Sequence, residues 1–340
     1  MSKETTEWLN TNILVGNTAK RGMAWHHSKS AQGAEPNWYE DFIPTDDILR
    51  RLFNFKVEPK PVFTLNPQSG EYEAVEGKMA QVCSDNHQVL AIHSDGYAGH
   101  NYAEWLMQNV DHLAHGDLGY ANAGLLKQRA VAFVQVEVAD NFETPDGVVF
   151  RPNLLAATSF DGSLATTYKR CVTNVVCDNT MMMALNEGGQ QFKVKHTKNS
   201  TLQLGAAREA LAMVLKTADD FTLQVNQLCA TTVTEQQWQQ VLDSLVSIPE
   251  DEGRGKTIAI NKREKLDELW CYDPRVEPWK HSAWGVLQAF NTHRQHYATV
   301  RNGHRVERAY TSALSGDTAE ADTKVLKTVS SVVGKQLLAV

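Results

Sequence analysis

The sequence predicts an α+β fold, with a twisted antiparallel sheet of hairpins and a meander packed with helices and followed by a helical C-terminal part. Short runs rich in β-branched and apolar residues cluster between residues 81 and 176, and the turn dipeptide Asp161-Gly162 separates two of them. From Leu202 onward, apolar residues recur at helical spacing instead.

Residues 1–75 are expected to form an irregular N-terminal segment with one short helix. Prolines and polar residues punctuate the segment and leave little room for regular structure. The helix is expected at Thr45–Phe53, with Thr45 as the N-cap and with Asp46 and Asp47 at the positive end of the helix dipole.

Residues 76–200 are expected to form an antiparallel β-rich core. An amphipathic helix is expected at Tyr102–Leu113, and a second helix, capped by Asp178 or Asn179, is expected to run through Leu185. The expected strands are Gln81–Cys83, Val89–His93, Ala130–Val138, Asn153–Phe160 and Ser163–Val176.

Residues 201–310 are expected to be a helical region that packs on this core, and residues 311–340 a C-terminal tail that is small and polar from Gly316 to Val325. Thr234 and Gln237 have the spacing of a capping box. The Gly-containing, charged segment 250–256 is expected to be a loop. The expected helices are Leu204–Leu228, Thr234–Leu245, Lys262–Trp270 and Trp284–Val300.

The net charge of −7 argues against a surface that is basic all over, but the charge is unevenly distributed. Residues 151–208 hold seven Lys or Arg and three acids, and residues 253–310 hold eleven Lys or Arg and six acids. Two locally basic segments in an acidic chain are compatible with a binding stripe for an anionic polymer, and also with ordinary solvated faces.

The longest apolar runs are far shorter than a membrane span, and the segment 1–10 is not a signal peptide by composition. We therefore expect a cytoplasmic protein, in a host bacterium, without a membrane partner. The five cysteines, at 83, 171, 177, 229 and 271, have no zinc-knuckle spacing, so reduced thiols are expected.

No motif nominates a catalytic residue, a metal or a cofactor. Gly253-Arg-Gly-Lys256 lacks the first glycine of a phosphate loop, because position 250 is Glu. His112, His115 and Asp117 could share a metal by spacing, but histidines at a helix C-terminus are also favoured by the helix dipole.

Several segments together resemble the phage/plasmid-like family called domain of unknown function 932. Ser159-Phe-Asp-Gly-Ser163 is similar to the family's S-H-D-G-S stretch, and Thr173–Thr180 is similar to its V-R-V-V-C-x-N-T stretch. Phe160 stands where the family has His, Asn174 where it has Arg, and Lys127-Gln128-Arg129 where it has a Gly-rich turn. The other similar segments are Met23–His26, Leu90–Tyr97 with Asn101, Ala123–Leu125, His196-Thr197 and Trp284–Tyr297.

The resemblance implies a protein of phage or plasmid origin, and its layout of hairpins and a helix resembles annealing recombinases of the Redβ and RecT kind. The resulting hypothesis is a non-catalytic homo-oligomer, a ring or filament, that binds and anneals single-stranded DNA during recombination. Annealing requires neutralised phosphates and exposed bases rather than catalytic carboxylates. The residues expected to contact DNA are Lys169, Arg170, Lys193, Lys195, Lys198, Arg294, Tyr297, Arg301 and Arg305.

Two alternatives stay open. One is a metal-dependent enzyme acting on nucleic acid, with Asp161, Asp178 and nearby histidines at its site. The other is a phage protein that binds and modulates a host factor, which would present an exposed apolar patch.

Overall fold

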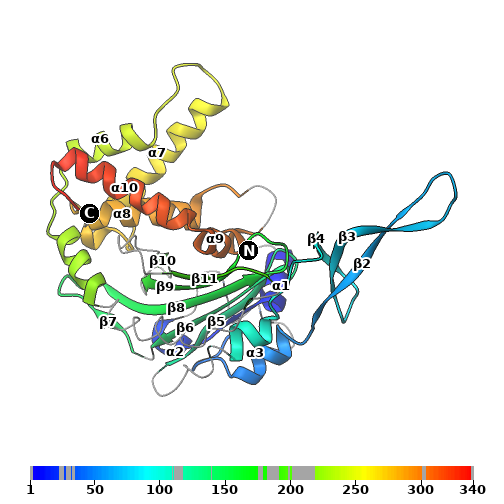
Figure 1. The fold of residues 1–340 in the computed structure, drawn as a ribbon. Helices are drawn as coiled ribbons and strands as arrows, with labels where there is room; N and C mark the ends of the chain where they lie inside the picture. The colour runs from blue at the N-terminus through cyan, green and yellow to red at the C-terminus, as the bar shows by residue number, and fades with distance from the viewer. Residues whose placement is uncertain are drawn as a thin grey trace. The chain divides into compact units, whose positions relative to one another are not determined.

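The computed structural model describes residues 3–22, 27, 32, 35–108, 110, 118–138, 140–174, 179–181, 191–197, 200, 219–300 and 304–337. The chain is an α+β protein with antiparallel sheets and a helical C-terminal part (Figure 1). It divides into two compact units, residues 1–140, 153–170 and 189–214 in the first and residues 141–152, 171–188 and 215–340 in the second.

The strands form two antiparallel sheets. In the larger sheet the order is β1-β5-β6-β8-β9-β10, with β7 paired to β8 and β11 paired to β9, and the smaller sheet has the order β2-β3-β4. The strands are β1 Ile13–Val15, β2 Val57–Leu65, β3 Tyr72–Cys83, β4 Val89–Ser94, β5 Leu118–Leu126, β6 Val131–Val138, β7 Phe142–Glu143, β8 Val149–Ser159, β9 Thr166–Asn174, β10 Asn179–Met181 and β11 Gln191–Val194.

The helices are α1 Lys3–Asn12, α2 Thr18–Arg21, α3 Thr45–Arg51, α6 Glu235–Leu245, α7 Arg254–Tyr272, α8 Ala283–Thr292, α9 Arg305–Ser315 and α10 Asp317–Val333. Shorter turns of other helix types are η2 Ala103–Gln108, η3 Glu277–Trp279 and η4 His293–Tyr297, and residues 219–229 are also helical. The capping box predicted from Thr234 and Gln237 is present at the start of α6.

The core of the first unit lies around β5 and β6, which are buried on both faces. Every residue of β6 is buried, including Gln135 and Glu137, so its polar groups need internal partners. Gln135 donates to Glu137 at 3.0 Å, and the Arg21 guanidinium reaches the Glu137 carboxylate at 3.3 Å. This polar chain explains how a strand with a buried carboxylate can lie in the middle of the sheet.

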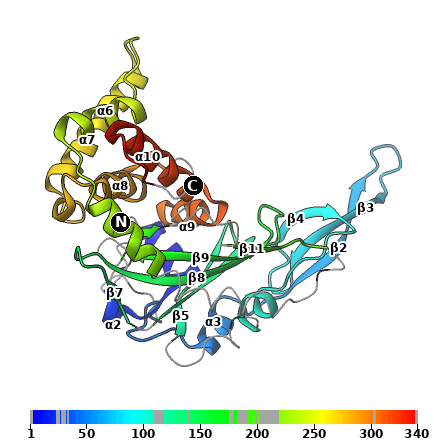
Figure 2. The same cartoon turned by 60° about the vertical axis from the view of Figure 1, so that its left-hand side comes forward.

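The hairpin β2–β3 extends beyond β4 as a two-stranded ribbon (Figures 1 and 2). We call its distal part, residues 61–77, the arm. Leu65 pairs with Tyr72 and Phe63 with Ala74, so these four side chains share one face of the arm. A register shift between Pro61 and Phe63 marks where the arm leaves the three-stranded part of the sheet.

The β5–β6 turn has three consecutive residues in the left-handed region. Lys127, Gln128 and Arg129 have φ of 48°, 53° and 75°. They stand where the family that the sequence resembles has a Gly-rich turn. Arg129 forms two hydrogen bonds with the Asp85 carboxylate and lies 3.5 Å from the centroid of the Phe55 ring. Lys127 donates to Ser163 Oγ at 2.9 Å. Side-chain contacts at both ends therefore hold a backbone that glycine would adopt freely.

Gln128→Gly should stabilise the first unit by about 0.5–1 kcal/mol, because it relieves left-handed strain. Within the described residues only the backbone carbonyl of Gln128 accepts a hydrogen bond, from Gln88, so no side-chain bond is lost, while glycine costs some unfolded-state entropy. Urea unfolding would measure the change. Arg129→Gly is the matched control, and it should show no gain because it loses the contacts with Asp85 and Phe55. A loss of stability in Gln128→Gly would contradict this account of the turn.

The core of the second unit is built from three fully buried tryptophans on α6, α7 and α8. The rings of Trp238 and Trp270 stack with centroids 4.8 Å apart, and Trp284 packs edge-on to Phe221. Trp238 Nε1 donates to Asp267 at 2.6 Å, so its polar edge is satisfied. Apolar residues of α10, Val325, Leu326 and Val329, complete this core.

The helix predicted to follow Asp178 or Asn179 begins instead as a strand. Asn179, Thr180 and Met181 pair with Asn174, Thr173 and Val172 of β9 as the edge strand β10. The backbone N–H and C=O groups of β9 offer hydrogen bonds to an edge strand. Asn and Thr are weak helix formers, so this segment is more stable when paired with β9 than as the start of a helix. The remainder of that predicted helix lies outside the described residues.

The sequence also underestimated the helices at both ends of the chain. Before residue 75 the structure has α1 and α2 besides α3, and three-residue β1, too short to show a period, pairs with β5. The segment predicted as a polar tail contains α10, whose N-cap is Gly316 with φ of 98°. Its buried residues occupy one face only, so its average polarity concealed the helix.

The basic loop predicted at 250–256 is shorter than expected. Gly253, with φ of 146°, is the N-cap of α7, and the helix includes Arg254 and Lys256. Lys256 also forms an ion pair with Glu252, which brings the loop end against the first turn.

Candidate nucleic-acid interface

A cleft of about 670 Å³ lies in the second unit, between residues of α6, α7, α8, η4, α9 and α10. Its apolar lining comes from residues that also border the tryptophan core, such as Phe290 and Val325. Its basic lining consists of Lys262, Lys265, His293, Arg294, Arg308 and Lys324. No Asp or Glu is among its lining residues in the described part of the chain.

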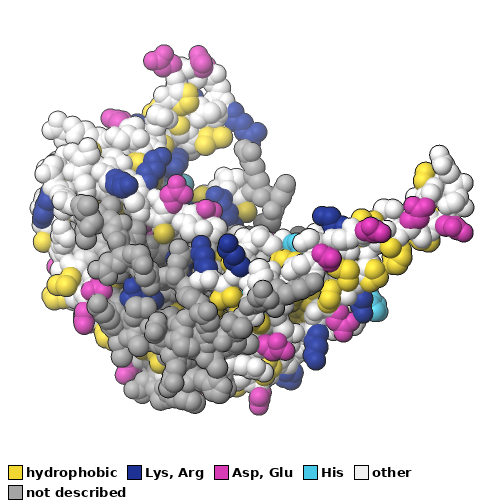
Figure 3. Space-filling view, in the orientation of Figure 1, with side chains coloured by type: hydrophobic (Ala, Val, Ile, Leu, Met, Phe, Trp, Pro, Cys, Tyr) yellow, Lys and Arg dark blue, Asp and Glu magenta, His cyan; other side chains and the backbone are white. Residues whose placement is uncertain are grey.

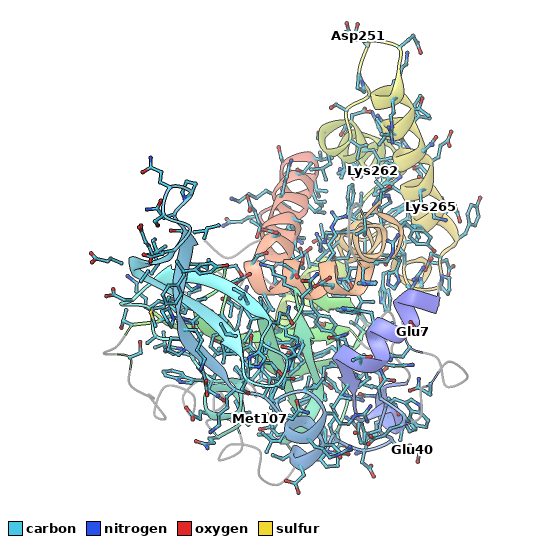
Figure 4. The ribbon with its side chains drawn as sticks, turned by 90° about the vertical axis from the view of Figure 1, so that its right-hand side faces the viewer. Glu7, Glu40, Met107, Asp251, Lys262 and Lys265 are labelled. Atoms are coloured by element: carbon cyan, nitrogen blue, oxygen red, sulfur yellow. The ribbon has the colours of Figure 1, made fainter. Side chains whose placement is uncertain are left out.

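Helical spacing explains how two lysines of α7 reach the cleft together. Ile258, Lys262 and Lys265 are separated by four and three residues, so they lie along one face of the helix. Figure 4 labels Lys262 and Lys265 on α7. On α10, Ala321, Lys324 and Val325 follow the same rule, with Val325 turned into the core.

The positively charged side chains that line the cleft repel one another. Burial lowers the pKa of Lys262 below its usual value, and the positive charge of Lys324 lowers it further. Neither lysine has a carboxylate partner within the described ranges. Uncompensated positive charge in a partly desolvated cleft is the condition under which an anion binds favourably.

The pKa of His293 is lowered by the same surroundings. Burial lowers its pKa to about 4, helped by the charges of Lys262, Arg305 and Lys265. At neutral pH its imidazole is therefore neutral and can hydrogen-bond without adding to the repulsion. The pKa of Arg305 is also lowered, by burial and then by Arg308, and its buried Nη1 has no hydrogen-bond partner among the described atoms.

Arg294 lines the cleft but its charge is already compensated. Its Nη2 donates to Asp322 Oδ1 at 2.7 Å and also to Asn291 Oδ1. Burial raises the pKa of Asp322, and Arg294 opposes that rise. Arg294 is therefore held in an ion pair with α10. Lys262, Arg308 and Lys324 are the cations of the cleft that are more available to bind an anion.

Tyr297 stands at the rim of the cleft with 40% of its surface exposed. Lys265 Nζ lies 4.2 Å from the centroid of its ring, and its hydroxyl accepts a hydrogen bond from Arg275 Nη2 at 3.1 Å. One face of the ring is thus occupied by a cation. The Arg275 guanidinium also lies over the ring, with its Cζ 5.8 Å from the centroid, so a base would stack on the part of the ring that stays exposed.

The structure brings together three of the four residues predicted from the C-terminal basic segment. Arg294 and Tyr297 line the cleft, Arg305 lies near enough to His293 to affect its pKa, and Arg301 is outside the described residues. Sequence reasoning missed Lys262, Lys265, Arg308 and Lys324, although the first three lie in the segment noted as basic. Their position on helix faces beside apolar residues was the available signal.

The basic residues predicted on the strands belong mostly to one ribbon. Lys169 pairs with Gln191 and Lys193 pairs with Thr167, so Lys169 and Lys193 share a face of the β9–β11 pair, while Arg170 faces the other way. Lys193 and Lys195 are exposed, Lys169 and Arg170 are half-buried, and Lys198 lies outside the described residues.

A second polar cluster lies in the first unit, where segments distant in sequence meet. Tyr97 Oη donates to the Ser159 carbonyl at 2.9 Å and lies 2.6 Å from His196 Nδ1. His93 stacks on Tyr97 at 4.0 Å, and its Nε2 lies 2.8 Å from the Phe160 carbonyl oxygen. The segments that resemble the family around Leu90–Tyr97, Ser159–Ser163 and His196-Thr197 thus converge on one place.

Two threonine hydroxyls connect this cluster to a buried histidine. Thr166 Oγ1 lies 2.6 Å from His100 Nδ1 and 2.7 Å from Thr158 Oγ1, and both hydroxyls approach His196 Nε2. The His100 ring stacks on Trp105 with centroids 3.5 Å apart. Burial lowers the pKa of His100 to about 3 and that of His196 to about 4, so both rings are neutral at pH 7.

Asp161, a residue of the enzymatic alternative, is held within its own turn. Its Oδ1 accepts hydrogen bonds from the backbone N–H of Ser163 at 2.9 Å and from its hydroxyl, and Lys127 lies 3.3 Å from Oδ2. Within the described residues no group of three His, Cys, Asp or Glu is placed to hold a metal ion. Asp178, His112, His115 and Asp117 are outside those residues.

The first unit should lose stability as pH falls from about 6.5 toward 4. The unfolded chain protonates His100 and His196 in this range, whereas the folded chain keeps them neutral, so the unfolded state binds more protons. His196→Gln should reduce that loss when urea unfolding is followed across pH. His27 and His293, with pKa near 4, will contribute in both proteins.

His87→Asn is the matched control, because His87 is exposed and Asn tolerates its φ of 59°. It should retain the wild-type slope of stability against pH. Equal slopes for His196→Gln and the wild type would show that the cluster is not the source of the pH dependence.

Together these features define an α+β protein with an antiparallel-sheet unit and a helical unit that holds a cationic cleft. The chain belongs to the family described as domain of unknown function (DUF932), whose model matches residues 89–314. No curated protein and no solved structure matches the chain. The match includes the histidine cluster and most of the cleft, and the arm and α10 lie outside it.

Four of the five cysteines, Cys83, Cys171, Cys229 and Cys271, are described, and no disulfide joins any of these four. Among the helices described, none combines the length and apolar character needed to cross a bilayer.

Proposed function

We propose that this protein binds single-stranded DNA through the cleft of the second unit, in the cytoplasm of a host bacterium, and that it anneals complementary strands as a non-catalytic oligomer of phage or plasmid origin. The observation that carries the proposal is the group of mutually repelling cations on α7, α9 and α10, without a lining carboxylate in the described residues. A phosphate backbone would supply the missing negative charge.

Single-stranded nucleic acid fits this arrangement better than a small anion does. The cleft combines point charges, which suit phosphates, with apolar and aromatic lining, which suits bases. Its lining residues come from six helical elements, α6, α7, α8, η4, α9 and α10. Tyr297, which is 40% exposed, lies at the rim, where a base could stack on the exposed part of its ring. Contacts of this kind neutralise the backbone and leave base edges free to pair.

The triple variant Lys262→Gln, Arg308→Gln, Lys324→Gln should weaken binding to a fluorescent oligonucleotide and flatten its dependence on salt. Loss of three phosphate contacts would lower the slope of log K against log salt by roughly 2. Fluorescence anisotropy over a salt series measures both quantities. Because these cations repel one another, their removal should not destabilise the unit.

Lys327→Gln is the matched control, since Lys327 is exposed on α10 but does not line the cleft. It should leave affinity and slope nearly unchanged. Failure of the well-folded wild type to bind the oligonucleotide at low salt would overturn the proposal. Binding without faster pairing of complementary oligonucleotides would remove annealing and keep strand binding.

The double variant Lys193→Gln, Lys195→Gln tests whether the β9–β11 ribbon also contacts the strand. If it does, the salt slope should fall by roughly 1 with the cleft intact. Lys78→Gln, at an exposed site on β3, is the control. An unchanged slope would restrict the DNA contacts to the cleft.

A further inference from the structure

The arm is an exposed surface that the proposed function does not use. Phe63, Leu65 and Tyr72 are 53%, 56% and 75% exposed, and they lie on one face of the ribbon. Figure 3 shows apolar side chains in a continuous row along the arm. Large apolar side chains that are gathered on a protruding ribbon mark a surface that another molecule covers.

The charge of the arm restricts what that molecule can be. Residues 61–77 contain Glu71, Glu73 and Glu76, all exposed, and no Lys or Arg. The nearest cation along β2, Lys60, is already paired with Glu58 at 2.7 Å. An acidic ribbon is repelled by nucleic acid and by anionic membranes, so its partner is a protein surface that is both basic and apolar.

The second unit of the same chain has a surface with these properties. In the cleft, Lys262 and Lys324 are basic and lack carboxylate partners in the described ranges, while Leu245, Ile258 and Phe290 are apolar. Ile258 is itself 53% exposed. Glu71 and Glu73 lie on the face of the ribbon opposite the apolar row, and Glu76 follows on the same side as Tyr72. A cleft that takes in the ribbon therefore meets the apolar row with its apolar floor and the glutamates with its lysines.

We propose that the arm of one copy docks into the cleft of a second copy. The contact joins two different surfaces, so a complex of two copies still has one free arm and one free cleft, and assembly continues into a ring or an open chain. The inference rests on the proposed function in that both use the cleft. A single strand and a neighbour's arm then compete for the same cations.

The test is a charge exchange between arm and cleft, followed by mass photometry and sedimentation velocity over a concentration series. One variant carries Glu71→Lys, Glu73→Lys and Glu76→Lys. The other carries Lys262→Glu and Lys324→Glu. Each alone should need at least a tenfold higher concentration than the wild type to assemble, because arm and cleft then have the same sign of charge.

An equimolar mixture of the two variants should assemble at concentrations where each alone is monomeric. In the mixture every arm finds a cleft of opposite charge on the other variant. This result requires two chains, so it also excludes docking of an arm into the cleft of its own chain. Glu40→Lys and Lys327→Glu, at exposed sites outside both surfaces, are the controls and should assemble like the wild type.

A wild type that stays monomeric at every concentration, or an oligomer that neither reversal affects, would overturn the inference. A mixture that remains monomeric would do the same. Leu65→Ser with Tyr72→Ser provides a second route, because both side chains are solvent-exposed and their loss should dissociate the assembly without unfolding the protein.

The same variants separate this inference from the proposed function. The arm variant retains the cleft, so it should bind the oligonucleotide at least as tightly as the wild type, whereas the cleft variant should not. Assembly that follows the charge exchange without any oligonucleotide binding would support arm docking and reject DNA binding. Oligonucleotide binding together with assembly that neither charge reversal affects would support DNA binding and reject arm docking.

Discussion

The cleft of the second unit depends on one buried ion pair, between Arg294 of η4 and Asp322 of α10. Asp322 is 3% exposed, and burial of a lone carboxylate there would be costly without the guanidinium beside it. The pair fixes α10 against the end of α8, where the Trp238–Trp270–Trp284 core already defines the helix positions. The lysines of α7 and α10 are consequently held close together although their charges repel.

That repulsion is a cost that the fold of the second unit bears. The apolar core offsets the cost of holding these cations together. Burial, and then the neighbouring positive charges, lowers the pKa of Lys262, Arg305 and His293. Any anionic group that enters, a phosphate or a glutamate of another copy, relieves a cost that the fold already bears. A preorganised cationic cleft therefore gains affinity without having to rearrange.

The first unit shows a different use of buried polar groups. Histidine and threonine side chains of the Tyr97–His196 cluster form hydrogen bonds with one another, and Arg129 and Lys127 hold the strained β5–β6 turn through Asp85 and Ser163. Several segments that resemble the family meet there. The arm, in contrast, keeps large apolar side chains exposed to solvent.

By itself the sequence determined the α+β class, the hairpins around residues 81–93 and 130–174, the capped helix α6 and the family, because period, turn residues and caps are local signals. It also placed Arg294, Tyr297 and Arg305 in one basic segment. Only the tertiary structure decided that Asn179–Met181 is a strand, because its pairing partner in β9 decides it, and that α10 is a helix, because burial of one face stabilises it. Only the tertiary structure also brought Lys324 and Lys262 into one cleft, because a contact across more than sixty residues leaves no local pattern in the sequence.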